Sequence, residues 1–162
     1  MLFRSGYAAC ENASDGPVTE GSVGAGTGAT VAKLLGRENA IKGGIGTERI
    51  DLGDGLLVGA IVAVNALGGV VDPETADLIA GPRDVDTGMM QDSMQLITSP
   101  GFGKEVESAP ANTTIGVVAT NATLTKAQAN KLASVAHDGL AMAVRPAHLM
   151  GDGDTMFALA TG

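Results

Sequence analysis

Two threonines lie directly before an apolar run of strand length, so their hydroxyl groups would stand at the end of a predicted strand. Thr113 and Thr114 follow Asn112 between a loose polar stretch and the apolar run 115–120. A hydroxyl at such a place acts as a nucleophile when a base lies beside it. A threonine is also an ordinary strand former. The residues alone leave both interpretations open.

Two carboxylates lie near the end of the chain. Asp152 and Asp154 are two residues apart, so both would face one side of an extended segment. Close carboxylates repel each other unless they bind a cation or share a proton. A calcium loop is one interpretation, but this segment lacks the regularly spaced ligands and terminal Glu of such a loop.

Apolar runs of strand length lead to these polar groups. Residues 56–64 are continuously apolar, which predicts a strand buried on both faces, and the run ends at Asn65. Asn65 is thereby placed at a sheet edge, where an ordinary role is to cap a turn. Residues 115–120 and 155–160 predict two further strands.

A helix is predicted between the last two strands. Thr125 and Gln128 have the spacing of a capping box. Apolar residues then recur at helical spacing until Pro146, namely Ala129, Leu132, Ala136, Leu140 and Ala143. The order strand, helix, strand indicates an α/β chain.

The connecting segments carry fewer signals. Residues 21–28 and 43–46 are glycine-rich and predict loops. Lys33 lies in a segment, 29–35, that fits either a short helix or a short strand. Residues 73–110 mix turn formers without periodicity and predict a long exposed connection.

The first glycine loop has an alternative interpretation. Gly24, Gly26 and Ala29 satisfy the fingerprint G-x-G-x-x-G/A, which suggests a dinucleotide-binding oxidoreductase. No strong apolar strand precedes this loop, and no βαβ pattern follows it. Gly24, Gly26 and Gly28 are therefore better explained as backbone that approaches a substrate.

Composition disfavours several classes of function. Eighteen acidic residues against ten basic ones give a net charge of −8, and no basic cluster accompanies aromatics, which argues against nucleic-acid binding. Cys10 is the single cysteine, and His137 and His148 stand apart, so we expect no metal site or cofactor. No apolar run approaches the roughly 20 residues of a membrane span, and no signal peptide is evident, so a cytoplasmic protein is predicted.

Six short motifs are specific when taken together: residues 16–21 (GPVTEG), 24–30 (GAGTGAT), 42–47 (KGGIGT), 62–66 (VAVNA), 112–115 (NTTI) and 152–155 (DGDT). In this order they resemble the L-aminopeptidase/D-esterase hydrolases, whose relatives include β-peptidyl aminopeptidases and nylon-oligomer hydrolases. The resemblance covers roughly residues 9–160.

The resemblance implies a precursor that cuts itself between Asn112 and Thr113. The hydroxyl of Thr113 would then attack an amide carbonyl, with its freed α-amine, of unperturbed pKa about 7.7–8.0, as general base. Asn65 matches the position that donates an amide to the oxyanion. Asp152 and Asp154 match the segment that orients the nucleophile and its ammonium.

Two further features bear on the substrate. Lys33 matches a lysine near the nucleophile of some relatives, where it would stabilise anionic charge, and Lys42 is the weaker candidate for that role. Some members of the family carry Ser and Glu at these two positions. This chain has Asp152 and Asp154 instead, and in this it resembles the nylon-hydrolase-like relatives. The substrate class therefore stays open among peptides, amides and related oligomers.

The resemblance also predicts the architecture, an α-β-β-α sandwich that is incomplete here at both ends. Residues 6–162 would form one partial domain, with 6–112 in a larger and 113–162 in a smaller chain, and residues 1–5 would be a non-native leader. A bacterial homo-oligomer of processed heterodimers is expected. The alternative is an inactive fragment or a non-catalytic assembly component.

Overall fold

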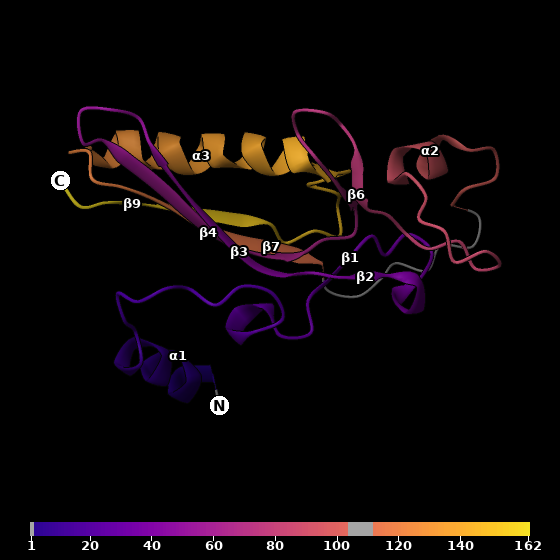
Figure 1. Cartoon of the computed structure of the whole chain (residues 1–162), viewed down its shortest axis with the longest axis horizontal. Helices are drawn as coiled ribbons and strands as arrows, with labels where there is room; N and C mark the ends of the chain where they lie inside the picture. The colour runs from indigo at the N-terminus through magenta and orange to yellow at the C-terminus, as the bar shows by residue number, and fades with distance from the viewer. Residues whose placement is uncertain (1, 104–111) are drawn as a thin grey trace.

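A four-stranded sheet forms the centre of the chain in a computed structural model that describes residues 2–103 and 112–162 (Figure 1). Its strands run in the order β3 (Gly44–Asp51), β4 (Leu57–Asn65), β7 (Thr113–Thr120) and β9 (Thr155–Ala160). The pairs β3–β4 and β4–β7 are antiparallel, whereas the pair β7–β9 is parallel. The strands predicted at 56–64, 115–120 and 155–160 are confirmed.

Strand β3 was wrongly predicted to begin as a loop. Glycines at its start let the chain pass close to other backbone, which a side chain would prevent. A Cβ on Gly43 would collide with the carbonyl oxygen of Val64, and a Cβ on Gly44 would collide with the backbone of Gly21. The glycines that suggest a loop are therefore what allows this edge strand to pair.

Helix α3 (Lys126–Ala143) covers one face of the sheet and connects the parallel strands β7 and β9 (Figure 1). The predicted capping box is confirmed, because Thr125 accepts a hydrogen bond from the Gln128 amide and the Gln128 side chain accepts one from that of Thr125. The helix ends before Pro146, since residues 144–145 form strand β8. The main core lies on this side of the sheet and comprises Val31, Ala32, Ala66, Ala80, Leu140 and Val144.

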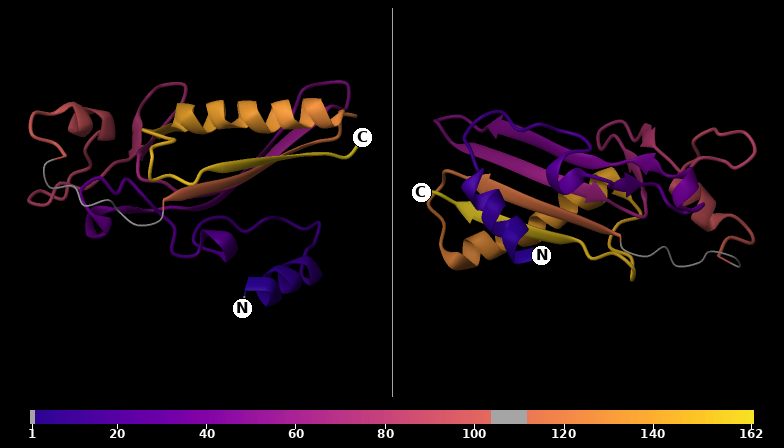
Figure 2. Two further views of the ribbon diagram at one scale, coloured as in Figure 1. Left: turned by 180° about the vertical axis from the view of Figure 1, so that it is seen from behind. Right: turned by 90° about the horizontal axis from the view of Figure 1, so that it is seen from below.

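The opposite face of the sheet is apolar and open. Ile61, Ile115, Phe157 and Leu159 are between 37% and 54% exposed on it. Helix α1 (Leu2–Glu11) lies on this side, away from α3 (Figures 1 and 2). The mixed α/β class is confirmed, and the described residues supply one helix layer and one large sheet of the expected sandwich.

Short elements surround one end of the sheet. They are η1 (Gly24–Gly26), β1 (Thr30–Val31), η2 (Arg37–Asn39), β2 (Ile41–Lys42), β5 (Gly69–Val71), β6 (Leu78–Ala80), α2 (Ser93–Thr98) and β8 (Val144–Arg145). The predicted connection 73–110 was wrong in part, because β6 and α2 lie within it, while its residues 104–111 lie outside the described ranges. Among the described helices, none has the length and apolar character needed to cross a membrane.

Candidate active site

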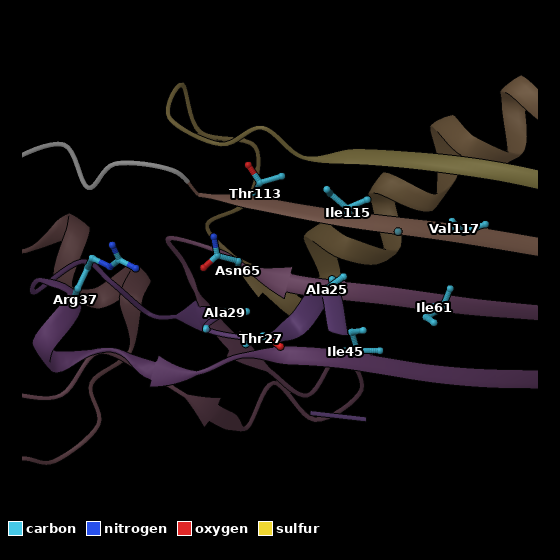
Figure 3. A pocket seen from close by; sticks show the side chains of 13 residues that line it. Ala25, Thr27, Ala29, Arg37, Ile45, Ile61, Asn65, Thr113, Ile115 and Val117 are labelled. Atoms are coloured by element: carbon cyan, nitrogen blue, oxygen red, sulfur yellow. The ribbon is translucent and has the colours of Figure 1, made fainter. Parts of the chain in front are cut away.

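The carboxyl end of β4 lies beside the amino end of β7. Asn65 is the last residue of β4, Thr113 is the first of β7, and the two are register partners. Figure 3 shows both side chains at the end of a pocket, with the amide nitrogen of Asn65 on the side that faces the Thr113 strand. The antiparallel register therefore brings together two predicted site residues that are far apart in sequence.

The peptide bond before Thr113 is tightly held. The Thr113 hydroxyl donates to the carbonyl oxygen of Asn112 at 2.5 Å. The same oxygen accepts the backbone N–H of Gly153 at 2.8 Å. The side chain of Asn112 is buried, with 2% of the residue exposed. The hydroxyl thus lies beside the carbonyl of its own preceding residue, and a second donor already points at that carbonyl.

Lys33 connects the two strand ends. Its ammonium donates to Asn65 Oδ1 at 2.7 Å, to the Asn65 carbonyl oxygen at 3.2 Å and to Asn112 Oδ1 at 3.0 Å. Only 3% of the residue is exposed. Burial and, second, the positive charge of Arg37 lower the pKa of Lys33 to about 8, while the negative charge of Asp152 acts in the opposite direction.

The backbone around Lys33 explains its burial. Ala32, in the left-handed region at φ 58°, donates its N–H to the carbonyl oxygen of Gly68, and the N–H of Lys33 donates to Leu67. These bonds turn the chain after β1 and direct Lys33 inward. Lys42, the weaker candidate, lies on β2 and is exposed, unlike Lys33.

The two aspartates have different surroundings. Asp154 Oδ1 accepts the backbone N–H of Thr114 at 2.8 Å, which fixes the start of β7. Asp152 Oδ2 accepts the N–H of Leu149 at 2.9 Å, while its Oδ1 is buried without a hydrogen-bond partner in the described part of the chain. Burial, and then the charge of Asp154, raises the pKa of Asp152. An unsatisfied buried oxygen of this kind suits an ammonium ligand.

Two residues near the aspartates were missed in the sequence. His148 was expected to stand alone, but its Nδ1 lies 2.9 Å from Asp154 Oδ2 and its ring packs edge-on against His137 at 4.9 Å. Gly153 donates its backbone N–H to the Asn112 carbonyl oxygen. The motif Asp152-Gly153-Asp154 could have pointed to Gly153, because it places a glycine between two candidate site residues. The contact between His148 and Asp154 depends on a turn of the chain that no local pattern predicts.

The glycine loop borders a pocket of about 490 Å³ next to Thr113. Gly28 lines this pocket, together with Ala25, Thr27, Ala29, Arg37, Ile45, Ile61, Ala63, Asn65, Thr113, Ile115, Gly116 and Val117 (Figure 3). Gly24 and Gly26 are not in its lining. Gly26 holds the loop against β3, since a Cβ there would lie 2.6 Å from both Gly21 O and Ile45 N. The loop contains a 3-10 turn followed by β1, so no βαβ unit forms in this described segment.

The model for peptidase family S58 matches residues 4–162. The chain belongs to peptidase family S58. An uncharacterized aminopeptidase of Mycobacterium leprae is 44% identical over 170 residues, covering 97% of this chain and 43% of the relative. A 6-aminohexanoate-oligomer endohydrolase of Paenarthrobacter ureafaciens is 31% identical over 159 residues, covering 96% and 43%.

Solved structures support the fold of this S58 chain. The L-aminopeptidase D-Ala-esterase/amidase of Ochrobactrum anthropi, described as a variant of the Ntn hydrolase fold, matches 94% of this chain and 35% of its own, with a TM-score of 0.59 and 23% identity. A protein of Pyrococcus horikoshii OT3 matches 96% and 36%, with a TM-score of 0.61 and 28% identity. The chain therefore spans less than half the length of these relatives.

Proposed function

We propose that this chain is the part of a self-processing amide hydrolase that carries its nucleophile, Thr113. One observation carries the proposal: the Thr113 hydroxyl lies 2.5 Å from the carbonyl oxygen of Asn112, within a buried junction. Membership of a peptidase family supports the reaction class. Cleavage of the bond between the two residues would leave 6–112 and 113–162 in separate chains and free the α-amine of Thr113.

The freed amine is the base that the precursor lacks. An amide nitrogen accepts no proton at neutral pH, whereas an α-amine has an unperturbed pKa of about 7.7–8.0. The amine would take the proton of the Thr113 hydroxyl as the oxygen attacks a substrate amide. The C–N bond of the substrate then breaks, and the amine product leaves with the proton that the Thr113 α-amine had taken up. The acyl part stays on the Thr113 oxygen as an ester, which water hydrolyses to a carboxylate and the free hydroxyl.

The surrounding side chains have separate roles in this reaction. The Asn65 amide would donate to the oxyanion that develops on the substrate carbonyl, a contribution of about 3–4 kcal/mol for comparable donors. Lys33 holds Asn65 through Oδ1 at 2.7 Å and adds positive charge nearby. The unsatisfied Oδ1 of Asp152 would accept the new ammonium. Asp154 fixes Thr114 and thereby the strand that bears the nucleophile.

The relatives narrow the substrate class to amides of amino acids. One is called an aminopeptidase and another an oligomer hydrolase acting on 6-aminohexanoate. We infer that this protein removes N-terminal residues from short peptides, amides or related oligomers. The open apolar face of the sheet, on which Ile115 and Phe157 are 50% and 54% exposed, is where the second sheet of the expected sandwich would pack. The reaction needs no metal or cofactor.

The function is tested by hydrolysis assays on the protein expressed between its natural gene ends. Amino-acid p-nitroanilides and 6-aminohexanoate oligomers are the substrates. Thr113→Ser keeps a hydroxyl and is expected to retain measurable turnover, whereas Thr113→Ala is expected to have none. Equal turnover by Thr113→Ala and the parent would exclude Thr113 as nucleophile. Absence of turnover in a folded, processed parent would favour a non-catalytic assembly component.

A further inference from the structure

We propose that Gly153 is a catalytic residue of the self-cleavage step, because its N–H polarises the scissile carbonyl and its missing side chain leaves room for the nucleophile. This inference rests on the proposed self-processing and adds the group that assists it. Gly153 lies between Asp152 and Asp154.

The pairing of β7 with β9 positions the N–H of Gly153. Strands β7 and β9 are parallel in the register Ile115 with Thr155, and an isolated parallel bridge extends the pairing to Asn112 with Asp152. This extension aims the N–H of Gly153 at the Asn112 carbonyl oxygen, at 2.8 Å. Donors at about 2.7–3.1 Å from a developing oxyanion stabilise the transition state of acyl transfer.

The space beside Thr113 exists because residue 153 is a glycine. A Cβ added to Gly153 would lie 2.7 Å from Thr113 Oγ1, closer than real Cβ contacts allow. The next nearest atoms, the Asn112 carbonyl oxygen and Thr113 Cγ2, would each be 3.7 Å away, at ordinary contact distance. A side chain at this position would therefore displace the attacking hydroxyl and little else.

The step that Gly153 assists is an acyl shift from nitrogen to oxygen. The Thr113 oxygen bonds to the Asn112 carbonyl carbon, and the π electrons of that carbonyl move onto its oxygen, facing the Gly153 N–H. The C–N bond then breaks, and the Thr113 nitrogen keeps the electron pair and takes up the hydroxyl proton. Water hydrolyses the resulting ester to the Asn112 carboxylate and the Thr113 hydroxyl, leaving a free amine.

A matched control lies two residues away in the same segment. A Cβ on Gly151 would meet no atom within 4 Å, and the residue has no positive φ. Gly151→Ala therefore restricts the backbone of this loop, but its methyl group does not reach Thr113 or Asn112. Gly153→Ala makes the same chemical change beside the hydroxyl.

The first experiment follows self-cleavage of the protein expressed between its natural gene ends, by intact mass spectrometry at timed intervals. Displacing the hydroxyl is expected to slow cleavage of Gly153→Ala about 100-fold, the cost of a misplacement of about 1 Å. Gly151→Ala should be cut at the parental rate. If Gly153→Ala is also cut at the parental rate, the role of Gly153 is overturned while the proposed function stands. A folded but uncut parent overturns both.

A second experiment reads the same contact without any cleavage. Thr113→Ala and Thr113→Val both lack the hydroxyl and should both remain uncut, but valine places one methyl group where the hydroxyl lies and a second where the threonine methyl lies. Adding Gly153→Ala should lower Tm by several degrees in the valine background and leave it unchanged in the alanine background. Equal shifts in Tm in the two backgrounds would show that a side chain at residue 153 does not crowd the Thr113 side chain, and the proposal would be overturned. This comparison does not depend on how well Gly153→Ala folds in the parent.

Discussion

Asn65 and Thr113 face each other as register partners at the adjoining ends of β4 and β7. Lys33 bonds to the side chain of Asn65 and to that of Asn112, the residue before Thr113, so one buried ammonium fixes both strand ends. The proposed nucleophile, oxyanion donor and scissile bond therefore lie at two adjoining strand ends that one buried side chain joins. Such rigidity suits a site in which small displacements are costly.

The substitution Asn65→Asp tests the amide donor of Asn65 separately from its acceptor oxygen. Asn65→Asp keeps an oxygen for Lys33 and for the Thr30 N–H, which both bond to Asn65 Oδ1, but it deletes the amide donor. The kcat of the processed enzyme should fall about 10²–10³-fold with little change in KM, because the lost interaction forms only in the transition state. Steady-state kinetics on a p-nitroanilide measures this. A kcat near the parental value would remove Asn65 from the oxyanion site.

Asp152→Asn should affect turnover more than self-cleavage. Asp152 Oδ1 is proposed to bind an ammonium that exists only after the chain has been cut. The variant should therefore be processed at close to the parental rate, while its kcat/KM falls about tenfold or more through loss of a charged hydrogen bond. Timed mass spectrometry and substrate hydrolysis on one preparation give both rates. Equal losses in the two rates would contradict this role.

Asp154→Asn, unlike Asp152→Asn, should affect self-cleavage as well as turnover. Asp154 accepts the N–H of Thr114 and lies beside His148, contacts that are present before cleavage. Loss of its charge should slow both processing and turnover.

Lys33 should make stability depend on pH. Its pKa is about 8 in the folded chain, while an unfolded lysine has a pKa of about 10.4. Between these values the unfolded state binds more protons, so the free energy of unfolding should rise with pH; below about pH 8 both states are protonated and the contribution is flat. Urea unfolding of the uncut Thr113→Ala protein at a series of pH values measures this.

A pair of lysine variants isolates that contribution. Lys33→Met should abolish the part of the rise that begins near pH 8, whereas Lys42→Met, at an exposed position on β2, should leave it intact. Identical pH profiles for the two variants would contradict a depressed pKa at Lys33.

Much of the central sheet could be predicted because its inner strands carry their own signal. Residues 56–64 and 115–120 are largely apolar and β-branched over the length of a strand, and the Thr125 capping box marks the start of α3. Strand β3 escaped prediction because its pairing depends on glycines that admit close backbone contact, and glycine also signals loops.

The positions of Asn65 and Thr113 at strand ends were predictable, because each adjoins an apolar run of strand length. The burial of Lys33 was not, since it follows from a left-handed Ala32 and from hydrogen bonds to a segment more than 30 residues away. The pairing of His148 with Asp154 likewise depends on a loop closing back on itself.

Intact mass spectrometry of the protein expressed between its natural gene ends, beside its Thr113→Ala variant, tests the central claim most directly. The account predicts two fragments from the parent, meeting between Asn112 and Thr113, and one uncut chain from the variant. A folded parent that remains a single chain would contradict self-processing, and Thr113 would then be an ordinary residue at the start of β7.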